Sequence, residues 1–159
     1  MLIDFYPDVT EFPTSQLCKT DMTIGGQAAY LYSPQTAAIV DRHFQWMKTY
    51  GLDGILLQRF LNDIPGKKST GDTVLKNVKN GANNHGRGFA IEYDISGVAA
   101  SNILTQIQTD WIYLVDQMKI TTQPSYFHHN GLPVVGIWEH GSPSTRTGIR
   151  LFHPIGICG

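Results

Sequence analysis

The sequence has no excess of either charge and no block of like charge along its length. Its 159 residues include 12 Lys and Arg and 13 Asp and Glu, which gives a formal net charge of -1. A chain with this balance has no long-range electrostatic attraction for nucleic acid or for an anionic membrane surface. We therefore expect neither a nucleic acid nor a membrane among its partners.

Cysteines are few and long apolar runs are absent. Cys18 and Cys158 could form at most one disulfide, too little for a disulfide-based scaffold, and we expect two free thiols. The first residues, MLIDFYPDVTEF, lack the basic start and the long apolar stretch of a signal peptide or a membrane-spanning helix. Neither feature indicates a cellular compartment.

The chain does have enough apolar residues to form a core. Apolar residues make up 42% of the sequence and charged residues 16%, which is typical of a globular protein. The length fits one domain of ordinary size. We interpret residues 1–159 as a single α/β domain.

Strand-like segments, rich in β-branched and aromatic residues, alternate with segments of helical periodicity. We expect strands at residues 2–6, 28–32, 53–60, 86–97 and 134–138, and helices at residues 33–50, 72–84 and 99–118. Gly51 and Gly86 stand where the first two helices should end. The polar stretch PGKKSTGD, residues 65–72, is expected to be a loop. This alternation is typical of a parallel sheet covered by helices on both sides.

Two architectures use such parallel βα units. A (β/α)8 barrel normally needs about 250 residues, whereas an open doubly wound sheet of five strands needs about 150. Length alone favours the open sheet. In both architectures ligands bind beyond the carboxyl ends of the strands, so the expected position of the site is the same.

Polar and aromatic side chains gather at these expected strand ends. As substrate-binding residues we predict Tyr6, Asp8, Tyr32, Gln58, Arg59, Tyr93, Trp138 and His140. The aromatic members offer flat faces on which sugar rings can stack. The two acids that end successive strands, Asp94 and Glu139, form the predicted catalytic pair. Carboxyl groups about 5 to 10 Å apart serve glycoside hydrolysis as acid and as nucleophile or base.

The strand around Asp94 carries a second acid, Glu92. Side chains alternate along a strand, so Ala90, Glu92 and Asp94 should share one face. If that face lines a barrel, Asp94 lies at the mouth and Glu92 about 7 Å deeper. The alternative is structural: Glu92 pairs with Arg59 or Arg87, and Asp94 caps the turn at residues 96–97.

Motifs for metals and cofactors are not matched. The late histidines His128, His129, His140 and His153 follow no tight ligand spacing. GKKST lacks the upstream glycine of a phosphate-binding loop, and GRG precedes a strand rather than a helix. A Gly-x-Ser-x-Gly elbow is also missing. We expect no metal and no cofactor.

Three segments together resemble a known group of enzymes: HFQWMKTYGLDGILLQRF, VLKNVKNGANNHGRGFAIEYDISG, and DWIYLVDQM leading to YFHHNGLPVVGIW. They are similar to glycoside hydrolase families 99 and 71, (β/α)8 barrels that include endo-α-mannosidases, α-glucanases and relatives labelled xylosidase or arabinosidase. The resemblance covers residues 30–138. It implies that the chain is part of a larger barrel with its first five strands present.

The chain also departs from that group. Nothing after Trp138 matches the late Glu-Trp-x-Glu-like stretch that carries the catalytic glutamates of family 99, and Glu92 stands where relatives have an apolar residue before Tyr-Asp. The resemblance therefore implies binding roles for Gln58, Arg59, Tyr93 and Asp94 and carries over no catalytic role.

The leading hypothesis is a glycoside hydrolase-like, carbohydrate-active protein that hydrolyses or binds glycans. The alternative is a non-catalytic sugar-binding or structural remnant of such a barrel, and a third reading is a flavodoxin-like binding or regulatory domain. Because an incomplete barrel leaves sheet edges unpaired, we expect either self-association into a homo-oligomer or an open sheet.

Overall fold

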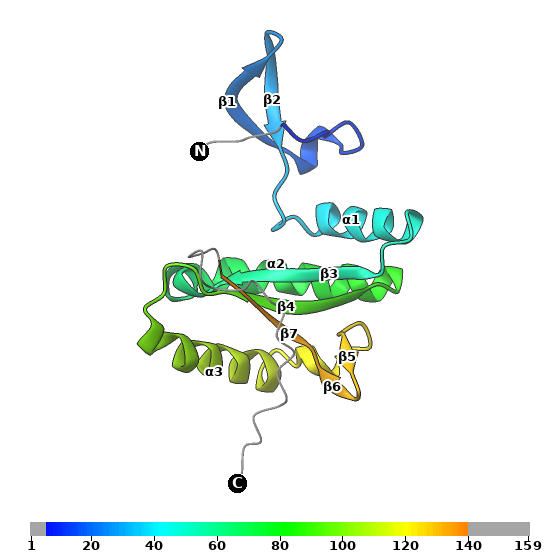
Figure 1. The fold of residues 1–159 in the computed structure, drawn as a ribbon. Coiled ribbons are helices and arrows are strands. Elements are labelled where there is room, and N and C mark those ends of the chain that lie inside the picture. Colours follow the sequence, from blue (N-terminus) through cyan, green and yellow to red (C-terminus); the bar gives the residue numbers. More distant parts are fainter. Residues whose placement is uncertain (1–5, 140–159) are drawn as a thin grey trace.

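The centre of the protein is a three-stranded parallel sheet. The computed structural model describes residues 6–139 (Figure 1). In the sheet, β4 (Gly88–Asp94) lies between β3 (Gly54–Phe60) and β7 (Val135–Trp138). Helix α2 (Ile64–His85) connects β3 to β4, and α3 (Ala100–Asp116) lies between β4 and β7 in the chain. The prediction of an α/β fold with parallel βα units is confirmed.

The strand register divides the sheet into two faces. Gln58 lies opposite Glu92, Glu92 opposite Gly136, and Asp94 opposite Trp138. Since paired residues of adjacent strands point to the same side of a sheet, these side chains share one face. We call it the open face; it comprises Leu56, Gln58, Phe60, Ala90, Glu92, Asp94, Gly136 and Trp138.

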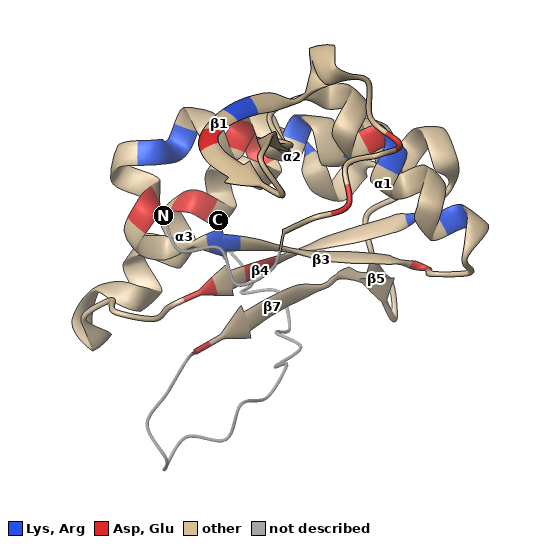
Figure 2. Cartoon of the chain, turned by 90° about the horizontal axis from the view of Figure 1, so that it is seen from above, with Lys and Arg blue, Asp and Glu red and all other residues tan. Residues whose placement is uncertain are grey.

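The other face of the sheet packs on the helices. Phe89, Ile91 and Tyr93 are fully buried there and belong to one core with Leu75 of α2 and Leu114 of α3. Burying each such side chain stabilises the fold by about 1.5 to 3 kcal/mol. Figure 2 shows α1, α2 and α3 on one side of the sheet. The prediction of helices on both sides is wrong for the described residues.

The amino-terminal part of the described chain forms a separate hairpin. Strands β1 (Cys18–Ile24) and β2 (Gln27–Leu31) pair antiparallel in a sheet of their own, preceded by the short helix η1 (Thr14–Gln16). Gly25 and Gly26 have φ values of 56° and 79° and supply the positive φ that the tight turn requires. Cys18 is exposed and free, and Cys158 lies outside the described residues.

The predicted five-stranded parallel sheet is wrong, because one of its expected strands belongs to this hairpin. Residues 28–32 do contain a strand, but its backbone pairs locally with β1 and not with β3. The parallel sheet accordingly contains three of the described strands rather than five. The missed strand, CKTDMTI, is polar at alternate positions and mostly exposed, so it lacks the apolar run by which strands are recognised. Of the strand predicted at 2–6, only Tyr6 is described.

Helix α1 (Ala37–Thr49) buries Ile39, Val40 and Phe44, the last against Gly81 of α2. Its N-cap is Thr36, three residues after Ser33, the N-cap that the Ser-Pro pair at residues 33 and 34 predicts. The chain leaves the helix at Gly51, whose φ is 73°, as expected.

Helix α2 follows the short helix η2 (Leu61–Asp63) and includes residues 65–72, so the predicted loop is wrong. Pro65 occupies the first turn, where its missing N–H costs nothing, and a kink follows at Lys67. Lys67 forms an ion pair with Asp63, and Lys68 forms one with Asp72. In each pair the two residues are about one helical turn apart, so the pair supports the helix. The helix ends at Gly86, in the left-handed conformation, as predicted.

Between α3 and β7 the chain forms a helix η3 (Ile120–Thr122) and a small antiparallel hairpin of β5 (His128–His129) and β6 (Leu132–Pro133). Both β5 histidines are exposed. Among residues 6–139, no three His, Cys, Asp or Glu side chains gather closely enough to hold a metal ion. Within the same range, none of the helices combines the length and apolarity needed to cross a membrane.

Candidate functional site

Asp94 and Gln58 form a pair at the carboxyl ends of β4 and β3. Gln58 Nε2 donates to Asp94 Oδ2 at 2.9 Å, and the backbone N–H of Ser96 donates to Asp94 Oδ1 at 2.8 Å. Asp94 is 3% exposed. The bond to Ser96 is the turn cap that the sequence offered as the structural role of Asp94. Both carboxylate oxygens are therefore engaged within the protein.

Glu92 lies two residues earlier on the same face and is only partly buried. Within residues 6–139 its carboxylate has no hydrogen bond and no ion pair among those the structure shows. Its stem packs against Gly136, where an added Cβ would lie 3.2 Å from Glu92 Cγ. Burial, together with the charge of Asp94, raises the pKa of Glu92 above its usual value.

The predicted structural ion pair of Glu92 is wrong. Arg87 donates to the carbonyl oxygens of Gly86 and Leu52. Arg59 points to the opposite face of the sheet, where its guanidinium binds acids from the helices. Glu92 therefore carries its charge without the cation that the sequence suggested.

Arg59 and Tyr93 belong to a buried polar network between the sheet and the helices. Arg59, 7% exposed, donates from Nε to Asp110 Oδ2 at 2.7 Å and from Nη2 to Asp110 Oδ1 at 2.8 Å. Tyr93 donates its hydroxyl to Asp110 Oδ2 at 2.8 Å. Burial and the charge of Asp110 raise the pKa of Tyr93 far above its usual value. These two predicted binding residues thus lie on the helix-covered face, away from the open face.

Asp72 of α2 completes this network. It accepts from Arg59 Nη2 at 3.1 Å, from the Tyr113 hydroxyl at 2.8 Å and from Lys68 Nζ at 3.2 Å. Burial opposes the charged form, but the hydrogen bonds from Tyr113, Lys68 and Arg59 outweigh it and lower the pKa of Asp72. Sequence reasoning missed Asp72 and Asp110, because acids 13 and 51 residues from Arg59 come together only when the helices pack.

Three further predicted residues have their partners in the amino-terminal part of the chain and in α1. The Tyr6 hydroxyl donates to the carbonyl of Tyr30 at 2.7 Å and accepts from its N–H at 2.9 Å. Asp8 accepts from the backbone and hydroxyl of Thr10. Tyr32 makes ring contacts with Phe12 and His43. Figure 1 shows the β1–β2 hairpin apart from the parallel sheet.

The remaining predicted residues follow β7. Trp138 ends this strand opposite Asp94 and is partly buried, and Glu139 is exposed directly after it. His140 lies outside the described residues. The structure thus brings Gln58, Asp94 and Trp138 to one rim of the open face, with the chain continuing into Glu139.

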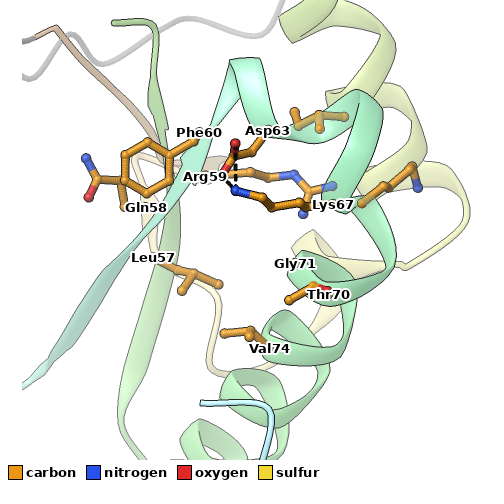
Figure 3. A pocket seen from close by; sticks show the side chains of 11 residues that line it. Leu57, Gln58, Arg59, Phe60, Asp63, Lys67, Thr70, Gly71 and Val74 are labelled. Carbon is orange, nitrogen blue, oxygen red and sulfur yellow. Dashed lines mark hydrogen bonds and ion pairs between the residues drawn. The ribbon is translucent and has the colours of Figure 1, made fainter. Parts of the chain in front are cut away.

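A hollow of about 170 Å³ lies between β3 and the first turns of α2 (Figure 3). Leu57, Ile64 and Val74 form its apolar wall, and the Lys67–Asp63 ion pair stands beside it. This volume is below the 300 to 1,000 Å³ or so of typical ligand pockets. A second hollow, of about 430 Å³, lies between α2 and the end of α3, but none of the predicted site residues lines it. We therefore take the open face, which carries the predicted polar residues, as the candidate site.

The fold and the rim together define a class: an α/β protein with a partial, TIM-barrel-like parallel sheet and polar side chains at the strand ends. No protein-family model and no curated protein matches the sequence. Among solved structures, the GH99 endo-α-mannosidase from Bacteroides thetaiotaomicron, in complex with BIS-TRIS-propane, is similar with a TM-score of 0.55 at 12% identity. The similarity covers 72% of this chain and 37% of that chain.

At that identity the similarity shows the fold alone. It supports the resemblance to family 99 at the level of a barrel-like α/β architecture. It gives no support to the relation with xylosidases or arabinosidases. The chain spans 37% of the length of the enzyme it matches.

Proposed function

We propose that the protein is a glycoside hydrolase-like, carbohydrate-active protein that binds glycans on the open face, at the carboxyl ends of β3, β4 and β7. One observation carries this proposal: the Gln58–Asp94 pair stands in register with aromatic and acidic side chains on a sheet face that none of the described helices covers (Figure 2). The fold similarity to an endo-α-mannosidase supports a glycan-related role.

The chemistry of this face suits a sugar. Hydroxyl groups both donate and accept hydrogen bonds, so they pair with the amide oxygen of Gln58 and with the free carboxylate of Glu92. Phe60, 48% exposed, and the partly buried Trp138 offer apolar ring faces at the ends of β3 and β7. Stacking on such rings adds apolar contact that hydrogen bonds alone do not supply.

Calorimetric titration with mannose- and glucose-containing oligosaccharides tests binding. We expect saturable heat with the wild-type protein, and a loss of affinity in Gln58→Ala, which removes the amide that holds Asp94. Gln45→Ala is the matched control, because Gln45 is exposed on α1. Absence of binding to both series of oligosaccharides would refute the proposal.

Hydrolysis by this site is the stronger form of the proposal. Asp94 and Glu139 are its candidate pair, with Asp94 facing the substrate and Glu139 as acid or base. A hydrolysis assay on the same oligosaccharides decides between an enzyme and a non-catalytic remnant. Binding without turnover supports the remnant. Turnover that survives in the Asp94→Ala, Glu139→Ala double variant removes the catalytic assignment.

A further inference from the structure

We propose that Glu92 is the carboxyl group that contacts the glycan on the open face, and that it takes up one proton from solvent when the glycan binds. This inference rests on the proposed function and adds the control of that site by pH. In the free protein Asp94 holds Gln58 and the turn at Ser96, so it can take part in hydrolysis only if those hydrogen bonds are exchanged when the substrate binds.

The two acids of β4 differ in burial and in hydrogen bonding. Asp94 is 3% exposed, and both of its oxygens accept hydrogen bonds, from Gln58 and from the N–H of Ser96. A ligand could reach its oxygens only by breaking those bonds. Glu92 is partly exposed on the same face, and residues 6–139 supply no hydrogen bond or ion pair to its carboxylate. Glu92 is therefore the acid of β4 whose carboxylate oxygens are free to bind a ligand.

Glu92 lies between neighbours on both adjacent strands. Its neighbour across the sheet on β7 is Gly136, and a Cβ there would lie 3.2 Å from Glu92 Cγ and 3.4 Å from Oε1. The carboxyl group thus lies over β7 backbone in the space left by a missing side chain. On the other flank it is in register with Gln58 of β3. Two strands consequently confine Glu92 without neutralising it.

The described part of the open face carries no positive charge near Glu92. From β3 the open face carries the neutral side chains Leu56, Gln58 and Phe60; from β4 it carries Asp94; and from β7 it carries Gly136 and Trp138, followed by the acid Glu139. Arg59, the nearest cation in sequence on β3, bonds Asp72 and Asp110 on the opposite face. The described charges of the open face are all negative.

These surroundings disfavour the charged form of Glu92, and a bound neutral glycan disfavours it further. Burial and the charge of Asp94 already raise the pKa of Glu92 in the free protein. A bound sugar displaces water and desolvates the carboxylate further, which raises the pKa again. The protonated group donates one hydrogen bond to a sugar oxygen and still accepts at its other oxygen. Glycan binding and proton uptake are therefore linked.

The sign of the pH dependence follows. Affinity is highest and constant below the pKa of Glu92 in the free protein. It falls as the pH rises between that pKa and the higher pKa of the complex, and it is low and constant above both. Each unit by which the glycan raises the pKa corresponds to roughly a tenfold change in affinity across that window.

The experiment is calorimetry with α-mannotriose and with maltotriose from pH 4 to 8, in buffers of different ionisation enthalpy that report the protons taken up. We expect wild-type affinity to fall by about tenfold or more as the pH rises. Glu92→Gln should abolish both the pH dependence and the proton uptake. Glu11→Gln, the same change at an exposed glutamate in the amino-terminal part of the chain, should leave both intact, and circular dichroism checks the fold of each variant.

The outcomes separate the two claims. A pH slope in Glu92→Gln equal to that of the wild type overturns the role of Glu92, while the proposed function stands. Wild-type binding that is independent of pH also overturns the role of Glu92 and leaves the proposed function standing. Absence of wild-type binding at every pH overturns the proposed function and this inference with it. Carbon-13 NMR titration of the Glu side chains gives an independent reading, since a Glu92 carboxyl that titrates at the usual value of 4.5 or below removes the premise.

Discussion

Arg59 and Asp110 join the sheet to α3 through two parallel hydrogen bonds, Nε to Oδ2 at 2.7 Å and Nη2 to Oδ1 at 2.8 Å. Both side chains are buried, at 7% and 2% exposed. A paired charge in the interior is tolerated because each partner satisfies the other, and an unpaired one is not. Tyr93 adds a third donor to the same carboxylate.

Removing the charge of Asp110 should therefore destabilise the protein strongly. We predict that Asp110→Asn lowers the free energy of unfolding by about 3 kcal/mol or more, because Arg59 stays buried without its main counter-ion. Urea denaturation measures the change. Lys67→Gln is the control: its ion pair with Asp63 is exposed, and its loss should cost at most about 1 kcal/mol. A loss below about 1 kcal/mol in Asp110→Asn would contradict the structural role of the pair.

The contact of α1 with α2 depends on Gly81. A Cβ at this position would lie 2.7 Å from Cδ2 of Phe44, which is 1% exposed. We predict that Gly81→Ala destabilises the protein by about 1 to 3 kcal/mol, since a buried ring must move. Gly66→Ala, in the same helix but with no atom near the added carbon, should instead be neutral or slightly stabilising. Equal thermal midpoints for the two variants would argue against the packing described.

Glu92 should also make stability depend on pH without any ligand. A carboxyl whose pKa is raised in the folded protein contributes stability that is fully present below its unfolded pKa and is lost as the pH rises through the folded pKa. We predict that Glu92→Gln is more stable than the wild type at pH 7, and that this difference disappears below the usual glutamate pKa of 4.5. Denaturation at both pH values measures it, with Glu139→Gln as control. A difference that persists unchanged at low pH would point to packing rather than charge.

The open face and the outer strands make self-association the expected state in solution. Leu56 and Phe60 are 38% and 48% exposed on this face, and β3 and β7 are the outer strands of the described sheet. Exposed apolar side chains beside unpaired strand edges favour association between chains. We predict a light-scattering mass above the 17.7 kDa of one chain, reduced by Phe60→Lys.

Leu104→Lys is the matched control for this measurement, because Leu104 is 61% exposed on α3, away from the open face. It should leave the mass unchanged. A mass equal to one chain for the wild-type protein at high concentration would show that the open face and the strand edges do not bring copies together.

Local patterns predicted the elements of the sheet well. The apolar runs that became β3 and β4 were recognised with their direction, because a strand followed by a long helix returns parallel to itself. Glycines at 51 and 86 marked two helix ends, since a left-handed residue there needs no Cβ. The helical stretch at 65–72 was not predicted, because part of its support, the ion pair of Asp72 with Arg59, comes from the preceding strand.

By itself the sequence determined the period and the chain order of the three strands of the parallel sheet and of the three long helices, since these depend on neighbours a few residues apart. It also placed Gln58 and Asp94 at strand ends. Only the tertiary structure decided on which face of the sheet each side chain lies. Arg59 and Tyr93 point toward the helices, where they bond Asp72 and Asp110, while Glu92 lies on the open face. Alternation along a strand fixes two faces, but the packing of distant helices selects which of them is buried.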